Sequence, residues 1–143
     1  MQGPGRIGFA TTVPEEVRLF DSVQFRVTLP AADMDRAKAW YAEKLGLRPV
    51  EEDEFGGAWY ETGDTPFLLY TSEFAGTNQA TAASYSYKVF DAAIASLRDR
   101  GVTFDEFDFG NFKTVDGVLT LPDGRKGAWF KDSEGNIRNI ISE

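Results

Sequence analysis

The chain has 143 residues, of which 42% are hydrophobic and 14% aromatic, and its formal net charge is −8. This length and composition predict one folded domain with its own core and exclude extensive disorder. The acidity excludes a broad basic face for nucleic acid, because phosphate contacts need clustered lysines and arginines. We interpret it as a source of solubility, with attraction for a cationic ligand as the alternative.

Histidine and cysteine are both missing from the sequence. Most zinc, copper and non-haem iron sites use imidazole or thiolate ligands, so no metal or other cofactor is expected. Histidine-dependent triads, histidine bases and disulfides are excluded for the same reason. No apolar run reaches the roughly 18 residues of a membrane span, and the N-terminal stretch lacks the apolar segment of a signal peptide. We therefore expect a cytoplasmic protein that does not contact a membrane.

Residues 1–21 contain glycines and prolines without a sustained period. They predict a loose N-terminal arm with a short strand near Arg6–Thr11. Residues 22–143 are expected to form a single domain, with a first unit at 22–72, a polar linker at 73–81 and a second unit at 82–143.

The first unit opens with an alternating stretch, Val23–Pro30, that predicts a half-buried strand ending at Pro30. Asp33 is expected to cap the following helix, and Gly46 to end it in the left-handed conformation. Apolar residues recur along this helix at helical spacing and predict a core-facing side: Met34, Ala37, Trp40, Tyr41 and Leu45. Three strands are then expected, at Arg48–Glu52, Ala58–Glu61 and Phe67–Thr71.

The second unit repeats this order. A strand at Ser84–Val89 precedes a helix that Asp91 caps, Ile94 and Leu97 pack and Gly101 ends. Further strands are expected at Val102–Glu106, Lys113–Leu121, Lys126–Lys131 and Ile137–Ser142. The tripeptide Glu54-Phe55-Gly56 also recurs, as Asp108-Phe109-Gly110. We predict an α+β fold of two βαβββ repeats that form a curved mixed sheet, with the helices on the convex side and a concave ligand cleft.

Strand alternation places six polar side chains on the predicted concave face: Arg26, Thr28, Ser84, Ser86, Lys88 and Asn139. The Arg26 and Lys88 side chains would hold a carboxylate or carbonyl oxygen of a ligand. Alternatively, they would pair internally with a carboxylate such as Glu61.

Aromatic residues fall on the predicted strands, and alternation turns about half of each adjacent pair toward the cleft. Alternation leaves open whether Trp59 or Tyr60, and Trp129 or Phe130, faces it. We take Trp59 and Trp129 as ligand-binding candidates, because an aromatic-lined cleft suits a flat or cationic ligand. Ordinary packing in the sheet core is the alternative.

The densest acidic run is Glu51–Glu54, and Asp105, Glu106 and Asp108 mirror it in the second half. Carboxylates of this kind suit magnesium or calcium. Consecutive residues on a strand point in opposite directions, however, so a solvated edge is the simpler interpretation.

Several short segments resemble the vicinal oxygen chelate superfamily, the group of glyoxalases, bleomycin-resistance proteins and extradiol dioxygenases. In the first half these are Val27-Thr28-Leu29-Pro30, Asp33, Asp35-Arg36-Ala37, Trp40-Tyr41 and Leu45-Gly46-Leu47. In the second half they are Asp91-Ala92-Ala93, Leu97, Arg100-Gly101-Val102, Ala128-Trp129-Phe130-Lys131-Asp132 and Glu134-Gly135-Asn136. The resemblance covers roughly residues 22–142.

The resemblance implies a cleft in which metal enzymes of the family place a His or Gln on the first strand of each half and a Glu on the last. The first-strand positions fall on Arg26 and Ser84, and the last-strand Glu falls on Asn139. The matching strand of the first half, Phe67–Thr71, contains no carboxylate. We therefore expect a member of the family without a metal site.

Three functions are open at this point. The first is a small-molecule-binding protein similar to bleomycin-resistance proteins, which sequesters a flat or cationic natural product in clefts shared by a homodimer and so confers antibiotic resistance. The second is a metal-independent lyase or isomerase of the glyoxalase type that uses Arg26, Lys88 or Glu61. The third is an interaction module with a filled cleft. No catalytic residue is assigned, and whether the protein is an enzyme is left open.

Overall fold

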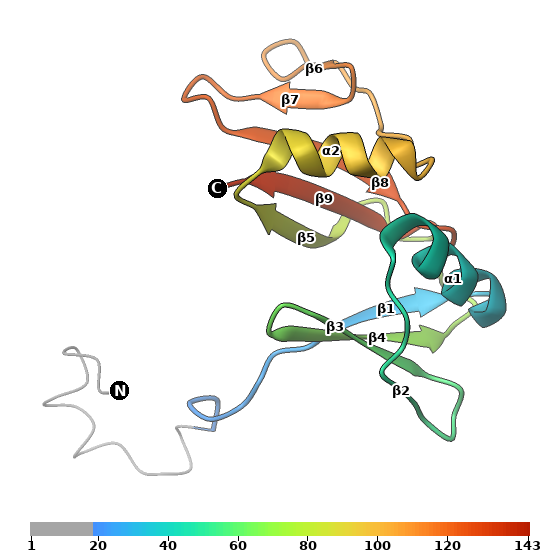
Figure 1. Cartoon of the computed structure of the whole chain (residues 1–143). Helices are drawn as coiled ribbons and strands as arrows, with labels where there is room; N and C mark the ends of the chain where they lie inside the picture. Colours follow the sequence, from blue (N-terminus) through green and yellow to red (C-terminus); the bar gives the residue numbers. More distant parts are fainter. Residues whose placement is uncertain (1–18) are drawn as a thin grey trace, which may run out of the picture.

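The computed structural model describes residues 19–143, and Figure 1 shows the arrangement of their helices and strands. The strand predicted near Arg6–Thr11 and most of the predicted N-terminal arm lie outside the described residues. The elements follow in the order β1 (Val27–Ala31), α1 (Met34–Trp40), the π-helical turn η3 (Tyr41–Leu45), β2 (Glu51–Glu52), β3 (Ala58–Thr62), β4 (Thr65–Thr71), β5 (Thr81–Tyr87), α2 (Phe90–Asp99), β6 (Thr114–Val115), β7 (Val118–Thr120), β8 (Lys126–Lys131) and β9 (Ile137–Ser142). No helix among residues 19–143 is both long and apolar enough to cross a membrane.

The strands form two sheets, ordered β1-β4-β3-β2 and β5-β9-β8-β7-β6. We call the first sheet with α1 the first repeat, and the second sheet with α2 the second repeat. In each repeat the first strand pairs in parallel with the last, and the other neighbours are antiparallel. The predicted α+β fold of two related repeats is confirmed. The strands form two hydrogen-bonded sheets, however, and not the single mixed sheet that was predicted.

The predicted strand Lys113–Leu121 is divided in the structure. Asp116 and Gly117 both have positive φ, 51° and 77°, and turn the chain between β6 and β7. The second repeat therefore has one strand more than the first after its helix. The predicted strand Val102–Glu106 is wrong: this stretch contains no strand, although Val102 and Phe104 are buried.

Two predicted boundary roles are also wrong. Pro30 does not end the first strand, because β1 continues through it to Ala31. An edge strand such as β1 tolerates a proline, since its second edge needs no backbone donor. Asp91 does not cap α2, which begins one residue earlier at Phe90; it lies in the first turn and accepts a hydrogen bond from the Lys126 ammonium at 3.1 Å.

The ends of the first helix follow the sequence prediction. The Asp33 side chain accepts a hydrogen bond from the Arg36 backbone N–H at 3.0 Å, which satisfies one of the free donors of the first turn. Gly46 follows the π-helical turn with φ of 68°, a conformation that favours glycine. Both predicted signals are confirmed.

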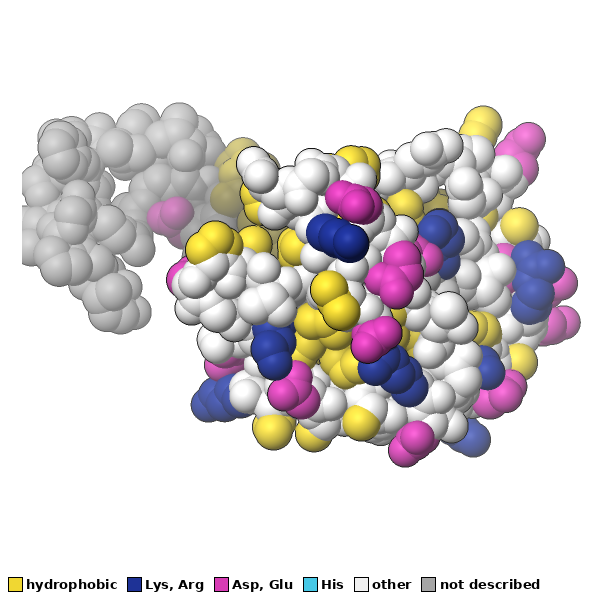
Figure 2. Space-filling model, turned by 90° about the horizontal axis from the view of Figure 1, so that it is seen from above, with side chains coloured by type: hydrophobic (Ala, Val, Ile, Leu, Met, Phe, Trp, Pro, Cys, Tyr) yellow, Lys and Arg dark blue, Asp and Glu magenta, His cyan; other side chains and the backbone are white. Residues whose placement is uncertain are grey.

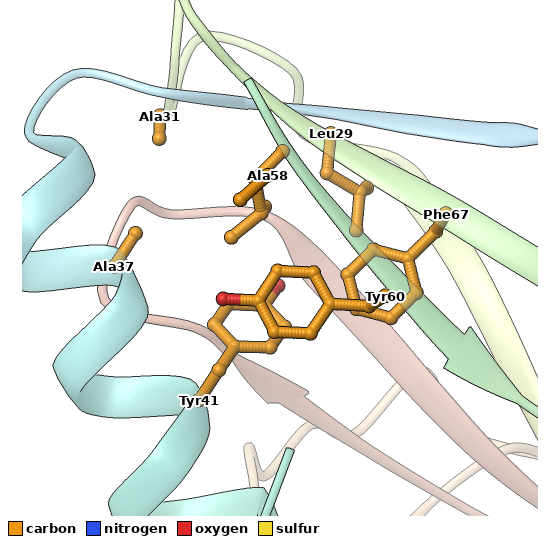
Figure 3. Close-up of a cluster of buried hydrophobic side chains, with 8 residues drawn as sticks. Leu29, Ala31, Ala37, Tyr41, Ala58, Tyr60 and Phe67 are labelled. Atoms are coloured by element: carbon orange, nitrogen blue, oxygen red, sulfur yellow. The ribbon is translucent and has the colours of Figure 1, made fainter. Parts of the chain in front are cut away.

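The first core lies between α1 and one face of the first sheet. Figure 3 shows Tyr41 reaching from the helix toward Tyr60 and Phe67, whose parallel rings are 4.8 Å apart. Leu29 completes the sheet side of this cluster, and all four residues are buried. Because these strand residues alternate with half-buried or exposed ones, the opposite face of the sheet remains accessible to solvent.

The second core is built in the same way from α2 and the second sheet. Ile94 and Leu97 of α2 pack on Phe130 and Ile140 of the sheet, which confirms the predicted packing of this helix. Trp40 of α1 packs against both cores, and its ring stacks on Phe130 at 6.3 Å. The first helix therefore joins the two repeats (Figure 1).

Hydrogen bonds from the start of α1 to the turn between β8 and β9 connect the two repeats. The buried Glu134 carboxylate accepts hydrogen bonds from the backbone N–H groups of Ala32 and Asp33, at 2.9 and 3.0 Å. Arg36 donates two more, at 2.8 and 3.0 Å. Asn136 of the same turn donates to the Pro30 carbonyl at 2.9 Å. The C-terminal residues that carry the family resemblance therefore hold the two repeats together.

A second buried contact joins the repeats through three polar side chains. The Tyr41 hydroxyl donates to Asp132 at 2.5 Å and accepts a hydrogen bond from Arg138. The Arg138 guanidinium and the Asp132 carboxylate are 3.6 Å apart, and both side chains are essentially inaccessible to solvent. Burial raises the pKa of Tyr41 well above its ordinary value, so this hydroxyl stays protonated.

Candidate functional site

We call the sheet face that points away from the helix the open face of each repeat. Strand register places Thr28, Leu68 and Trp59 in one row across the open face of the first repeat. It places Ser84, Asn139 and Trp129 in the corresponding row of the second repeat. The two tryptophans therefore occupy equivalent positions in the two repeats.

Strand register thereby decides which residue of each adjacent aromatic pair faces away from the helix, a choice that the sequence left open. Tyr60 and Phe130 are completely buried under the helices, whereas Trp59 and Trp129 are half-buried on the open faces. An internal repeat missed in the sequence analysis carries the same information: Gly57-Ala58-Trp59-Tyr60 recurs as Gly127-Ala128-Trp129-Phe130. In both copies the small alanine and the second aromatic residue face the core, which leaves the tryptophan for the other side.

Trp59 lies beside a hollow of about 430 Å³ with charged walls. The guanidinium carbon of Arg26 is 5.1 Å from the centre of the Trp59 ring, within the range of a cation–π contact. Three carboxylates, from Glu51, Glu61 and Asp64, line the same hollow. The first-repeat site therefore combines an aromatic surface with a predominantly acidic rim.

Trp129 has a different environment. Its indole N–H donates to the Thr81 hydroxyl at 3.2 Å, and the Phe107 ring contacts it edge-on at 5.3 Å. The Asn139 amide, next to it in the row, is buried and accepts from the Ser84 hydroxyl at 2.9 Å. The second tryptophan therefore contacts an uncharged hydroxyl and an aromatic ring instead of an arginine.

The predicted polar residues are only partly brought together. Thr28, Ser84 and Asn139 lie on the open faces, as does Ser86, which donates to the C-terminal Glu143 side chain at 3.2 Å. Lys88 lies beyond the end of β5 and lines a separate hollow with Asp123 and Arg125. In residues 19–143, neither Arg26 nor Lys88 forms an ion pair, so their predicted internal pairing with a carboxylate is not observed.

The residues at the family's metal positions do not fit a metal ion. Strand register makes Thr28, rather than Arg26, the equivalent of Ser84, which corrects the predicted pairing of these positions. Leu68 is the equivalent of Asn139. Hydroxyl, aliphatic and amide groups form a poor donor set for a transition metal. Within the described part of the chain, no three Asp or Glu side chains are grouped closely enough to hold a cation.

Charges on the surface are mixed. On the face shown in Figure 2, basic and acidic side chains are interspersed around a hydrophobic patch. The Glu51–Glu52 part of the acidic run forms the short edge strand β2, and both residues are exposed, which agrees with a solvated edge. Glu52 pairs with Lys38 at 2.9 Å.

Residues 24–137 match the Glyoxalase/Bleomycin resistance protein/Dioxygenase superfamily. The chain belongs to this superfamily. Comparison with curated proteins found no match. The superfamily assignment therefore rests on the family match, and the folds of solved structures agree with it.

Several solved structures have the same fold. UcmS2 is 21% identical, with a TM-score of 0.66, over 84% of this chain and 97% of that chain. A glyoxalase/bleomycin resistance protein from Catenulispora acidiphila DSM 44928 is 18% identical, with a TM-score of 0.64, over 85% and 99%. A bleomycin-binding protein in complex with bleomycin is 18% identical, with a TM-score of 0.63, over 85% and 99%. At these identities the likeness concerns the fold and not the activity.

Proposed function

We propose that this superfamily member binds a flat or cationic organic molecule on its open sheet faces, without a metal and without changing the molecule. The observation that carries the proposal is the equivalent placement of Trp59 and Trp129, one on each open face. Half-buried indoles bind planar groups by stacking, and their faces attract cations. The other residues proposed to line the site are Arg26, Thr28, Ser84, Ser86 and Asn139.

The first repeat favours a positively charged group. The Arg26 guanidinium already lies over the Trp59 ring, which supports the proposal that this surface accepts a cation. A cationic ligand would take the place of the guanidinium and would also meet Glu51 and Glu61 at the rim. Because the chain carries a net charge of −8, long-range attraction acts in the same direction.

The bleomycin-binding neighbour supports the same class of ligand, since that protein is seen in complex with a natural product. By analogy we propose sequestration of such a compound in the cytoplasm, which would lower its free concentration and confer resistance. We also propose that two copies of the chain assemble and share their clefts. Light scattering on the eluting protein tests this: twice the mass of the 143-residue chain supports it, and the mass of one chain contradicts it.

A second candidate function is a metal-independent lyase or isomerase. It is favoured by one observation: Arg26 and Glu61, a candidate electrophile and a candidate base, line the same hollow beside Trp59. A neighbour named lactoylglutathione lyase, from Agrobacterium tumefaciens, is 15% identical with a TM-score of 0.63, over 85% of this chain and 93% of that chain. Incubation followed by NMR of the recovered compound separates the two functions, because a binding protein returns its ligand unchanged, whereas an isomerase returns a compound of the same mass but a different structure.

Titration calorimetry with a panel of flat and cationic antibiotics, bleomycin among them, tests the proposal. We expect saturable binding of at least one compound, unchanged by a chelator, and recovery of that compound with its original mass and NMR spectrum. If folded protein binds no compound of the panel, that result would contradict the proposed function. Stoichiometric zinc, nickel or iron in the purified protein would contradict its metal independence.

A further inference from the structure

A second hollow lies between the two repeats and shares residues 63–65 with the hollow beside Trp59. It has a volume of about 470 Å³ and is bordered by the turn between β3 and β4 and by β5. Phe67 and Tyr85 contribute aromatic rings to its wall, and Arg138 is also part of it. Ser84 and Ser86 of the proposed site border this hollow, but neither Trp59 nor Trp129 lines it.

Arg138 is an unusual wall residue because its side chain is only 1% exposed. Its guanidinium packs on three aromatic rings, those of Tyr41, Phe67 and Tyr85, at 5.3, 5.6 and 5.0 Å. One terminal nitrogen donates to Tyr41, but Nε has no hydrogen-bond partner within residues 19–143. A buried donor without a partner costs stability unless something else accepts from it.

Tyr85 adds a second polar atom of the same kind. Its hydroxyl is buried and lacks a partner among the described residues, and its ring is the one nearest to the Arg138 guanidinium. Two donors without acceptors therefore belong to adjacent side chains in the wall of one hollow. Such a pair indicates an acceptor that the chain itself does not supply.

The charges nearby indicate that this acceptor is neutral. Asp132 lies 3.6 Å from the Arg138 guanidinium and already balances its charge, and Asp64 stands in the wall of the hollow. A carboxylate ligand would therefore bring an additional, uncompensated negative charge into a largely buried space. A carbonyl oxygen accepts hydrogen bonds without this cost. The aromatic rings in the wall favour a ligand that is itself aromatic.

We propose that the hollow between the repeats binds a small uncharged aromatic molecule whose carbonyl oxygen accepts from Arg138 Nε and the Tyr85 hydroxyl. Both donor atoms are covered, so the ligand enters as the Tyr85 side chain rotates. Tyr85 is half-buried and comes from β5, an edge strand of its sheet.

Nitrogen-15 NMR of the full chain tests the proposal with three probes of one size: acetophenone, ethylbenzene and benzoate. We expect acetophenone to shift the Arg138 Nε–H resonance in a saturable way, with ethylbenzene and benzoate at least about tenfold weaker, the ratio expected for one hydrogen bond to a charged group. The Arg26 Nε–H resonance and the indole resonances of Trp59 and Trp129 report separately on the open faces, and a shift of these resonances without a shift of Arg138 Nε–H would overturn the proposal.

Two variants complete the test. Thr62→Trp fills the hollow from a half-buried position that does not line the hollow beside Trp59, and it should abolish the acetophenone response. Tyr85→Phe removes one donor, keeps the ring and should weaken acetophenone but not ethylbenzene. An equal response to all three probes, a response that survives Thr62→Trp, or no response at all would overturn the proposal. The indole resonances of Trp59 and Trp129 report on the open faces independently, so the two proposals fail separately.

Discussion

Glu134 and Arg36 join the two repeats through a pair of hydrogen bonds, from Arg36 Nε at 2.8 Å and from Nη2 at 3.0 Å. The carboxylate side chain is inaccessible to solvent, although about half of the arginine side chain is exposed. Burial alone raises the pKa of Glu134, but the hydrogen bonds from Arg36, Ser133 and the Asp33 backbone N–H outweigh it and lower the pKa to about 2. The carboxylate is therefore charged over the whole physiological range.

Replacing this carboxylate should destabilise the protein. Glu134→Gln keeps the shape but loses the charge that accepts from Arg36 and from two backbone N–H groups, so we expect a loss of about 2 kcal/mol of unfolding free energy. Urea unfolding at pH 7 measures it. Glu43→Gln is the matched control, because Glu43 is exposed and lies 3.6 Å from Lys44, a pair expected to contribute little. Equal losses in the two variants would contradict the role of Glu134.

The same contact should make stability depend on acid. Because the folded-state pKa of Glu134 is about 2 and lies below its ordinary value of 4.5, its contribution is complete above about pH 4.5 and is lost as the pH falls toward 2. The difference in unfolding free energy between the parent protein and Glu134→Gln should therefore shrink across this window. A difference that stays constant from pH 6 to pH 2 would show that ionisation of Glu134 is not its source.

Two buried tyrosines in the first core provide a second matched pair. Tyr41 donates to Asp132 and accepts from Arg138, whereas the Tyr60 hydroxyl is buried without a partner among residues 19–143. Tyr41→Phe leaves two buried charged groups short of a hydrogen bond and should cost about 2–3 kcal/mol. Tyr60→Phe should be neutral or stabilising. Thermal unfolding ranks the stability of the two variants. A lower melting temperature for Tyr60→Phe than for Tyr41→Phe would contradict the hydrogen bonds assigned to Tyr41.

Gly135 lies in the last turn, against the linker between the repeats. Its φ is +87°, and a Cβ placed there would lie 2.8 Å from the Cα of Gly76. Gly124 has a similar φ of +92° but nothing within 4 Å of its Cβ position. Gly124→Ala should therefore cost only the backbone strain of about 1 kcal/mol, while Gly135→Ala should cost that amount and displace the linker as well. Similar melting temperatures for the two variants would contradict this close approach.

The periodic parts of the fold were predictable from the sequence. Strands β8 and β9 have the predicted bounds, Lys126–Lys131 and Ile137–Ser142, because turn-forming residues mark their ends: Pro122-Asp123-Gly124 before β8 and residues 132–136 between the two strands. The Asp33 cap and the Gly46 stop were predictable because each depends on local backbone chemistry. The start of α2 was not: its N-cap, Val89, forms no side-chain cap, so no local signal marks the boundary.

The candidate site was only partly predictable, because alternation does not say which of two adjacent aromatics faces the helix. That choice depends on packing against Tyr41 in the first repeat and on α2 in the second. The polar role of Asn139 was likewise hidden, since its amide hydrogen bonds internally to Ser84 and the Ala128 carbonyl. Arg138 gave no signal at all, because a buried arginine on a core-facing strand position contradicts the usual pattern.

The central claim is that the ligand rests on the two equivalent indoles without a metal. The most direct test measures, by calorimetry in the presence of a chelator, how tightly the best compound of the panel binds to three variants. These variants are Trp59→Leu, Trp129→Leu and Phe74→Leu. Phe74 is 70% exposed and away from both rows, and it is the control. We predict that each tryptophan variant weakens binding by about tenfold or more, while Phe74→Leu binds as the parent does. Unchanged affinity in both tryptophan variants, or binding abolished by the chelator, would contradict the account.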